Sequence, residues 1–398
     1  MDPYYHIHRP TIILNEERAR QNIRRMAEKA ALKKVKFRPH FKTHQSAAIG
    51  EWFRDEGIQA ITVSSLEMAK YFADHGWQDI TVAFPFNLRE IEDVWELGSR
   101  CHLELLVDAP EPVDFLDKRY PRELDLWIEI DAGGRRTGIP SEDPAAVIQL
   151  AEKISKSSHL KFKGILSHFG QTYHASSQEE AARLYTKGIA RMRPVQTALR
   201  KAGFRKTQIS VGDTPGCCAS DDLSGVDEVR PGNFIFFDAT QLNIGSCSEE
   251  EIALAVACPV VSKHPDRGEV ILYGGAVHLS KEFRMENGVV SYGEIAFAVP
   301  GGWSEKIPGG FVRSLTQEHG VVHLPPEVMD KIKVGDLLMV LPVHSCLTVA
   351  AMGEYQTLEG ERIGTMVSRS GDETEGHGGE GEQEQDDAQD ADHPAVFG

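Results

Sequence analysis

A single lysine stands between two histidines in the stretch "FRPHFKTHQ" at residues 37–45, where Lys42 lies two positions from His40 and two from His44. A neutral lysine amine attacks aldehydes to form a Schiff base, so this side chain has a chemical use if it lies in a protected site. A solvated loop lysine is the ordinary alternative. The sequence assigns no role to the two histidines.

The stretch "GDTPG" at residues 212–216 has the groups needed to hold a phosphate. Its glycines leave backbone N–H groups accessible, and Thr214 adds a hydroxyl. An ordinary turn built on Gly and Pro is the alternative. A Schiff-base lysine combined with a phosphate loop suggests pyridoxal phosphate, because the chemistry of this cofactor needs both.

Arg136, in "IDAGGRRTG" at residues 130–138, bears on the same hypothesis. A guanidinium group does not lose its proton in proteins, so beside the pyridine nitrogen of the cofactor it would leave that nitrogen unprotonated. The ring would then withdraw electrons more weakly than a ring paired with a carboxylate. An additional electrophile, such as a metal ion, would compensate.

His344 and Cys346 stand two residues apart in "VHSCL" at residues 343–347. On a strand both side chains leave from the same face and can bind one ion. Imidazole with thiolate favours zinc over magnesium or calcium, and two protein ligands leave positions open for a substrate. A buried structural cysteine beside a surface histidine is the alternative. His319, in "QEHG", adds a polar side chain that can line the same cleft.

The first part of the sequence provides elements that can bring these residues together. From residue 17 to about 240, strand-like and helix-like segments alternate as in parallel βα units. Eight strands with intervening helices match a TIM-type (β/α)8 barrel. The expected strands are 35–41, 60–64, 79–84, 102–108, 124–131, 160–168, 207–211 and 234–238, and the clearest helices are 66–75 and 144–155.

The candidate residues collect at the carboxyl ends of these strands. Lys42 follows the first strand and Arg136 follows the fifth. His168 ends the sixth strand, and the loop at 212–216 follows the seventh. In a barrel those ends meet at one mouth, where active sites of this fold lie, so we expect these side chains to share a site.

The sequence changes character after residue 238. Short strand-like segments separated by Gly and Pro indicate a mainly antiparallel β domain, and the extended segment 11–15 can pair into it. The expected organisation is a cofactor-binding barrel, a β domain with the metal site that the N-terminal segment joins, and an acidic disordered tail. The expected β strands are 252–261, 269–273, 289–297, 312–324 and 336–341, and the three parts are 17–245, 246–370 with 1–16, and 371–398.

The composition excludes several classes of protein. The formal net charge is -17, but ten of the sixty acids lie in residues 371–398, which contain no Lys or Arg, so the remainder carries about -7. An acidic chain without a basic cluster is not expected to bind nucleic acid. No apolar run approaches a membrane span, and no secretory signal pattern stands at the start. With six scattered cysteines, these features predict a cytoplasmic location.

Taken together, the motifs resemble the pyridoxal-phosphate enzymes with an alanine-racemase-type (fold type III) barrel, in particular the D-serine dehydratase and D-threonine aldolase branch. The specific stretches are "RPHFKTH" at 38–44 and "PVHSCLT" at 342–348. Six weaker matches lie in order between them: "TVSSLEMA", "IEIDAGGRRTG", "GILSHFGQTYHA", "GDTPG", "EVRPGNFIFFD" and "QEHG". The resemblance covers nearly the whole chain apart from the acidic tail.

The resemblance implies a role for each candidate. Lys42 forms the Schiff base with the cofactor, and Arg136 faces the pyridine nitrogen, although the adjacent Arg135 leaves that choice uncertain by one residue. Tyr173 lies near the cofactor. The phosphate is held by Gly212 and Thr214, beside Asp213, an acid that would repel a phosphate if it pointed inward. His344 and Cys346 bind zinc or another divalent metal, and the protein is a homodimer.

The metal motif also implies a reaction. The dehydratase branch carries His-x-Cys, as here, whereas the aldolase branch carries His-x-Asp. We therefore expect a dehydratase of a D-β-hydroxy amino acid, D-serine first and D-threonine or 3-hydroxyaspartate next, with Lys42 as the base at Cα. A retro-aldol enzyme using His168 or His319 as base is the alternative, and a non-catalytic cofactor carrier is a remoter one.

Overall fold

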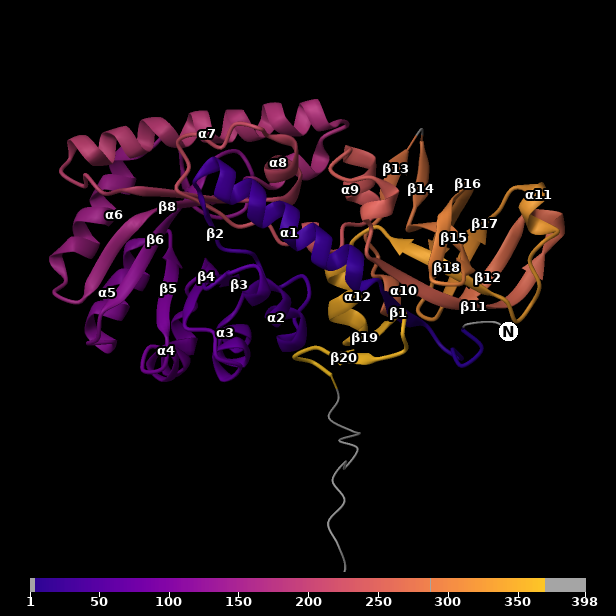
Figure 1. Cartoon of the computed structure of the whole chain (residues 1–398). Helices are drawn as coiled ribbons and strands as arrows, with labels where there is room; N and C mark the ends of the chain where they lie inside the picture. The colour runs from indigo at the N-terminus through magenta and orange to yellow at the C-terminus, as the bar shows by residue number, and fades with distance from the viewer. Residues whose placement is uncertain (1–3, 287, 369–398) are drawn as a thin grey trace, which may run out of the picture. The chain divides into compact units, whose positions relative to one another are not determined.

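The computed structural model describes residues 4–286 and 288–368. The acidic tail predicted to be disordered lies outside these residues. Two sheets organise the described chain: a parallel sheet in its first part and an antiparallel sheet in its second part. In Figure 1 most of the first sheet is drawn from indigo to magenta and most of the second from orange to yellow, with the indigo strand β1 in the second sheet.

The parallel sheet is a closed barrel, as predicted. Its strands are hydrogen-bonded in the order β2-β10-β9-β8-β6-β5-β4-β3, and every pairing is parallel. A further bridge between His40 and Thr62 joins the two ends of this order and closes the barrel. The strands are β2 (Lys36–Phe37), β3 (Ile61–Val63), β4 (Asp79–Pro85), β5 (His102–Val107), β6 (Leu124–Asp131), β8 (Leu160–His168), β9 (Gln208–Gly212) and β10 (Glu228–Val229), and a short β7 (Ile139–Pro140) pairs with β6.

The prediction for the eighth strand is wrong. Residues 234–238 are not a strand; the eighth strand is β10, which ends before Arg230 and Pro231. Proline has no N–H to continue a ladder. The backbone N–H of Phe234 instead donates to the hydroxyl of Thr214, and Phe237 has a φ of 52°, which breaks any extended run.

Helices cover the outside of the barrel (Figure 1). The helices predicted at 66–75 and 144–155 are confirmed as α3 and α6, and each begins at a side-chain cap, Ser65 and Asp143 respectively. The α-helices are α1 (Glu16–Lys33), α2 (Ala47–Asp55), α3 (Leu66–Asp74), α4 (Ile91–Leu97), α5 (Pro110–Arg119), α6 (Pro144–Lys156), α7 (Gln178–Lys201), α8 (Thr214–Ala219), α9 (Ala239–Ile244), α10 (Ala276–Leu279), α11 (Pro326–Met329) and α12 (Ser345–Met352). The 3-10 helices are η1 (Leu88–Glu90), η2 (Gly170–His174), η3 (Asn233–Ile235), η4 (Glu249–Glu251) and η5 (Pro265–Arg267).

The second sheet also closes on itself. Its order is β12-β17-β16-β15-β18-β11-β1-β19-β20, and an additional β11–β12 pairing joins six of these strands into an antiparallel barrel. The N-terminal strand β1 lies between β11 and β19. The strands are β1 (Thr11–Leu14), β11 (Leu254–His264), β12 (Glu269–Tyr273), β15 (Gly293–Val299), β16 (Gly302–Leu315), β17 (His319–His323), β18 (Leu337–Pro342), β19 (Glu354–Thr357) and β20 (Arg362–Gly364); β13 (Arg284–Glu286) and β14 (Val289–Ser291) form a separate hairpin.

Two strands predicted in this part are each divided in the structure. The segment 312–324 contains the end of β16, a turn and β17, and the turn closes with Thr316 N donating to the His319 carbonyl. The segment 289–297 is divided between β14 and β15. Strand-forming residues such as Val, Ile and Phe stand on both sides of each division, so the composition alone did not reveal it.

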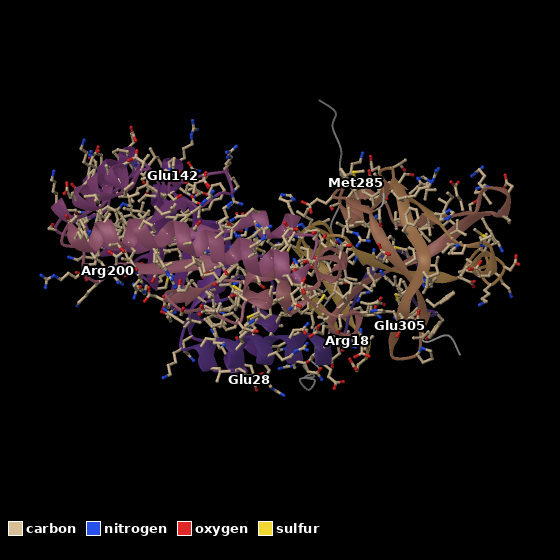
Figure 2. All side chains as sticks on the ribbon, turned by 90° about the horizontal axis from the view of Figure 1, so that it is seen from above. Arg18, Glu28, Glu142, Arg200, Met285 and Glu305 are labelled. Atoms are coloured by element: carbon tan, nitrogen blue, oxygen red, sulfur yellow. The ribbon has the colours of Figure 1, made fainter. Side chains whose placement is uncertain are left out.

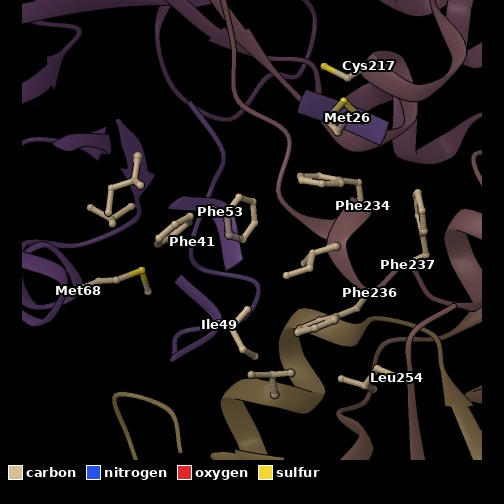
Figure 3. Close-up of a cluster of buried hydrophobic side chains, with 14 of the residues drawn as sticks. Met26, Phe41, Ile49, Phe53, Met68, Cys217, Phe234, Phe236, Phe237 and Leu254 are labelled. Carbon is tan, nitrogen blue, oxygen red and sulfur yellow. The ribbon is translucent and has the colours of Figure 1, made fainter. Parts of the chain in front are cut away.

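An aromatic cluster packs where the barrel meets the second sheet (Figure 3). Phe53 lies 4.9 Å from Phe41 and 6.3 Å from Phe234, measured between ring centroids. Phe236 contacts Tyr355 of β19 at 5.6 Å. These five side chains are buried, so the segment after β10 belongs to the core of both sheets. None of the helices in the described part of the chain is long and apolar enough to cross a bilayer.

The interior of the barrel is polar at the amino ends of the strands. Arg38 has no exposed surface and binds three carboxylates, those of Asp79 (2.7 Å), Glu104 (3.1 Å) and Glu228 (2.7 Å). Lys163 also contacts Glu104. The guanidinium group of Arg38, which follows β2, therefore links β2 to strands β4, β5 and β10.

Replacing Arg38 with methionine is expected to lower the free energy of unfolding by about 3–5 kcal/mol, because Glu104 and Glu228 would remain buried without their main partner. Denaturant unfolding measures this change. Arg24→Ala, which removes an exposed ion pair with Glu56, is the control and should cost less than about 1 kcal/mol. Equal effects of the two substitutions would show that the buried network does not stabilise the barrel.

Candidate active site

A cavity of about 780 Å³ lies at the carboxyl ends of the barrel strands. Its walls include side chains from the barrel, among them Lys42 and His168, and side chains from the second part of the chain, among them Glu282, His344 and Cys346. A cavity of this size accommodates a small cofactor and a substrate. The residues that approach it come from positions more than 300 apart in the sequence.

Lys42 lies in a tight turn after β2 and is exposed towards the cavity. Its backbone N–H donates to Nδ1 of His40 (3.4 Å), and its carbonyl accepts from Nε2 of Gln45 (3.1 Å). Gln45 has a left-handed φ of 53°, which reverses the chain. Burial and then the Lys42 charge hold the pKa of His40 well below its usual value, so His40 is neutral.

The two histidines that flank Lys42 in sequence have different surroundings. His40 lines the cavity, whereas His44 does not and is completely buried. The His44 ring packs against Phe41 at 4.4 Å and Phe53 at 5.5 Å, and its Nδ1 accepts from the N–H of Ser46 (3.2 Å). Burial lowers the pKa of His44 to about 3. His44 is therefore a neutral core residue.

The choice between the two adjacent arginines follows from the loop geometry. Arg136 lines the cavity, and Arg135 is not among the lining residues. Arg135 has a φ of 53°, and its N–H donates to the carboxylate of Asp131 (3.0 Å), which tightens the turn after β6. This turn directs the second arginine inward.

His168 ends β8 and is fixed in one tautomer. Its Nδ1 lies 2.5 Å from the carbonyl oxygen of Gly212, and since a carbonyl only accepts, Nδ1 carries the hydrogen. Burial and then the Lys42 charge lower the pKa of His168 to about 3. A histidine with this pKa is a weak general base, which argues against the base role considered for His168.

Asp213 lines the cavity, but its carboxylate is held by hydrogen bonds within its own loop and from a neighbouring segment. Its carboxylate accepts from the N–H of Gly216 (2.5 Å) and from the hydroxyl of Thr172 (2.7 Å), so it caps α8. Burial raises the pKa of Asp213 to about 7, so near neutral pH it carries less negative charge on average than an ordinary aspartate.

Tyr173 and Thr214 lie next to each other on neighbouring segments. The hydroxyl of Tyr173 accepts from the N–H of Thr214 (3.5 Å), and burial followed by the charge of Asp213 raises the pKa of Tyr173 well above its usual value. Tyr173 and Gly212 line the cavity, whereas Thr214 lies behind them.

His344 and Cys346 are not on a strand, contrary to the prediction. Strand β18 ends at Pro342; His344 is the residue directly before α12, and Cys346 lies in the first turn of this helix. Their side chains still contact each other, because the helix starts directly at the cavity wall. The Cys346 thiol donates to the hydroxyl of Thr43 (3.3 Å), next to Lys42.

These two side chains also shift each other's pKa. Burial opposes charge on both groups, but His344 lowers the pKa of the Cys346 thiol, while Cys346 and then Glu282 raise the pKa of His344 to about 11. The carboxylate of Glu282 lies 2.6 Å from Nδ1 of His344. A thiolate beside an imidazole is a donor set that suits a soft divalent metal.

The sequence did not single out several other cavity residues. Arg230 is buried, lines the cavity and donates to the hydroxyl of Ser210 (2.8 Å) and to the carbonyl of Ser167 (2.9 Å). Burial lowers the pKa of Arg230 to about 10. Arg230 lies in "EVRPGNFIFFD", one of the stretches that resemble the family, but no role for this arginine followed from the sequence.

Glu129 was missed for a different reason. Its position inside β6 reads as an ordinary strand residue, yet the side chain is 4% exposed and lines the cavity. One carboxylate oxygen accepts from the hydroxyl of Thr137 (2.9 Å), and the other has no hydrogen-bond partner among the described residues. Burial raises the pKa of Glu129.

His319 is the one predicted site residue that the structure does not bring near the others. It begins β17 opposite Tyr273 of β12, is exposed and is not among the lining residues of the cavity. A catalytic role for His319 in the cavity of its own chain has no geometric support.

The fold is a closed parallel barrel, with a lysine after its first strand, joined to an antiparallel barrel. Comparison with known proteins identifies the family that has this fold. Residues 14–240 match the family model described as alanine racemase, N-terminal domain, and residues 253–358 match a putative serine dehydratase domain. The chain belongs to the alanine racemase N-terminal domain family, whose fold is that of the type III pyridoxal-phosphate enzymes.

Curated relatives cover nearly the whole chain. The D-threo-3-hydroxyaspartate dehydratase of Delftia sp. (strain HT23) is 29% identical over 360 residues, which are 88% of this chain and 93% of the relative. The D-serine dehydratase of Dictyostelium discoideum is 26% identical over 390 residues, 90% of this chain and 95% of the relative. A 3-hydroxy-D-aspartate aldolase of Paracoccus denitrificans is 25% identical, over 90% of this chain and 91% of the relative.

Solved structures agree with this assignment. The Delftia dehydratase superposes with a TM-score of 0.84 at 27% identity, covering 92% of this chain and 99% of that chain. That enzyme has also been solved as a histidine-to-alanine mutant and as a cysteine-to-alanine mutant in the metal-free form. The two substituted positions are two residues apart, which is the spacing of His344 and Cys346.

The residues of the cavity fit both groups that the family implies. Lys42 presents an amine to the cavity, and Gly212 and Gly232 let its wall pack closely, because a Cβ at Gly212 would lie 2.8 Å from Arg230 and one at Gly232 would lie 2.7 Å from the His40 carbonyl. The contacting imidazole and thiol of His344 and Cys346 are suitable metal donors. We therefore treat pyridoxal phosphate and a metal ion as compatible with this cavity.

Gly232→Ala is expected to weaken cofactor retention and to lower stability by about 1–3 kcal/mol, because the added Cβ would lie 2.7 Å from the His40 carbonyl and displace the turn that carries Lys42. Bound cofactor per chain and denaturant unfolding measure the two effects. At Gly134 a Cβ would meet no atom closer than 3.6 Å, so Gly134→Ala is the matched control. A Gly232 variant that keeps full cofactor content and stability would contradict this account of the cavity wall.

Proposed function

We propose that the chain is a pyridoxal-phosphate-dependent ammonia-lyase that dehydrates a D-β-hydroxy amino acid, D-serine or a close relative such as D-threonine or 3-hydroxyaspartate, to a 2-oxo acid and ammonia. The observation that carries this proposal is that Lys42 of the barrel and the His344–Cys346 pair line one cavity. An amine for the cofactor and a metal-binding pair for the β-hydroxyl are the two functions that such a dehydration needs.

Lys42 is the residue that would hold the cofactor and then take the proton from Cα of the substrate. When bound, pyridoxal phosphate supplies an electron-withdrawing ring for the electron pair released at Cα, and a zinc ion supplies a Lewis acid for the departing β-hydroxyl. The neighbouring His40 is neutral, so it does not compete with Lys42 for a proton. Arg230 and Arg136 make this side of the cavity favourable to anions.

The residues proposed to hold the cofactor surround Lys42. Arg136 faces the ring nitrogen in this proposal, and Tyr173 lies beside the ring. The backbone at Gly212 and near Thr214 holds the phosphate. Asp213 supports this loop through its cap on α8.

His344 and Cys346 are proposed to bind zinc, although another divalent metal is compatible with the same donors. Thiolate character at Cys346 favours a soft metal. The aldolase alternative needs a base for the β-hydroxyl. His168 has too low a pKa for that task, and His319 lies outside the cavity. A non-catalytic carrier of pyridoxal phosphate would not need a metal site, so this alternative does not explain the His344–Cys346 pair.

We also propose that the protein is a cytoplasmic homodimer. Several large apolar side chains are exposed near the cavity, including Phe84 (58%), Phe283 (55%) and Met285 (61%), and the first two line the cavity mouth. Figure 2 shows Met285 at the surface. A second copy of this chain would cover such a surface. All six cysteines are free, as a reducing compartment favours.

Incubation of the purified protein with D-serine, D-threonine and D-3-hydroxyaspartate is expected to yield a 2-oxo acid and ammonia from at least one of them, and a strong chelator should reduce the rate at least tenfold. Mass spectrometry of the products measures this. If glycine and an aldehyde are formed instead, the protein is an aldolase and the proposed dehydration is wrong. Bound cofactor without turnover of any substrate would favour the carrier.

Borohydride reduction of the cofactor-loaded protein is expected to attach one cofactor covalently to Lys42, and Lys42→Ala should abolish this attachment. Intact mass and peptide mapping detect the product. Lys281 is the other lysine among the cavity lining residues, so Lys281→Ala is the matched control and should still be labelled. Labelling that persists in the Lys42 variant would show that Lys42 is not the lysine that binds the cofactor.

A further inference from the structure

The loop between α10 and β13 carries Glu282 to the metal-binding pair. Lys281, Glu282 and Phe283 all line the cavity, and Glu282 lies 62 residues before His344 in the sequence. Its carboxylate oxygen is 2.6 Å from Nδ1 of His344. The mechanism above gives Glu282 no task, although its carboxylate is hydrogen-bonded to the His344 ring.

This contact determines which nitrogen of His344 can bind a metal. An ionised carboxylate only accepts hydrogen bonds, so Nδ1 of His344 must carry the hydrogen. The free lone pair of a neutral His344 is then on Nε2. A carboxylate that holds the far nitrogen of a metal-binding histidine fixes the ring orientation and makes the other nitrogen a stronger donor.

The backbone of the loop is strained in a way that holds Glu282 in place. Ser280 has a φ of 66° and a ψ of 178°, a region that residues other than glycine rarely occupy. Its hydroxyl accepts from the backbone N–H of Glu282 (3.2 Å). Ser280 therefore sets the direction in which Glu282 leaves the loop.

The other members of the metal-binding pair are held from the barrel. The N–H of Ser345 donates to the carboxylate of Asp238 (3.1 Å), which fixes the start of α12. Cys346 contacts Thr43 and the amide of Asn233. The barrel thus positions the backbone and the thiol, whereas the His344 ring is oriented from the loop.

We propose that Glu282 is a positioning residue for the metal site: it fixes the Nδ1–H tautomer and the ring orientation of His344, so that Nε2 binds the metal beside the Cys346 sulfur. This inference rests on the proposed metal site. Glu282 itself is not a ligand in this proposal, because its oxygen is occupied by Nδ1 of His344, on the side of the ring away from Nε2.

The test is the affinity of the cofactor-loaded protein for Zn²⁺, measured by competition with a chromophoric chelator. Glu282→Ala is expected to weaken Zn²⁺ binding about 10–100-fold. Glu282→Gln should recover part of this loss, because its amide oxygen still accepts from Nδ1–H. Glu305, an exposed carboxylate on β16 outside the cavity, provides the control Glu305→Ala, which should leave the affinity unchanged.

Two spectroscopic measurements separate positioning from direct ligation. In the Co²⁺-loaded Glu282→Ala variant the thiolate-to-cobalt absorption should persist at saturating Co²⁺, since Cys346 remains a ligand. X-ray absorption should find the same number of oxygen neighbours around zinc in the wild type and in Glu282→Ala. The loss of one oxygen would make Glu282 a ligand and overturn the positioning role.

The outcomes also separate this inference from the proposed function. If the wild type binds Zn²⁺ through His344, shown by loss of binding in His344→Ala, and Glu282→Ala binds equally well, only the role of Glu282 is wrong. If the wild type binds no Zn²⁺, or if His344→Ala binds it as well as the wild type, the metal part of the proposed function and this inference fall together.

Discussion

The buried carboxylate of Asp238 is the interaction that joins the two halves of the site. One oxygen accepts from the amide of Asn233 (2.6 Å) and from the N–H of Ser345 (3.1 Å), and the other caps α9 through Gln241 (3.0 Å). These bonds tie the segment after the last barrel strand to the first turn of α12. Without them, neither sheet alone would place a metal-binding pair beside Lys42. Since Asp238 is 1% exposed, these donors replace the water that its carboxylate loses on burial.

Local patterns in the sequence were sufficient for the long elements and for most of the reactive side chains. Strand β8 at Leu160–His168 is long and alternates apolar residues with lysines at its start, and α3 has a cap and apolar residues at helical spacing, so both could be predicted. Lys42 and the His344–Cys346 pair are reactive types at unusual positions. The eighth barrel strand could not be predicted, because two residues, Glu228 and Val229, carry no periodicity.

The wrong predictions and the missed residues have a common cause: tertiary contacts, which a local sequence pattern does not contain, determine the structure at these positions. The run "FIFF" at residues 234–237 is as apolar as a buried strand, but its aromatic side chains pack towards two different sheets, which a strand would not allow. The helix α12 is apolar on all sides, so its sequence lacks the contrast between faces that signals a surface helix. Glu282 and Arg230 acquire their positions only from contacts distant in sequence, with His344 and Ser167 respectively.

Burial is the main cause of the pKa shifts of the two histidines near Lys42, whereas mutual attraction shifts the pKa values of the proposed metal ligands. His40 and His168 are neutral because burial and the neighbouring cations oppose a further positive charge. In the His344–Cys346 pair, by contrast, each side chain favours the charged form of the other: His344 lowers the pKa of Cys346, and Cys346 raises the pKa of His344.

Arg230 keeps its position in the wall of the cavity through a chain of hydrogen bonds. It donates to Ser210, which donates to Glu228, which binds Arg38 at the amino end of the barrel. The polar interior of the barrel therefore extends from its floor to the cavity. Because a buried guanidinium group needs such compensation, the carboxylates that stabilise the closed barrel also make a cationic cavity wall possible.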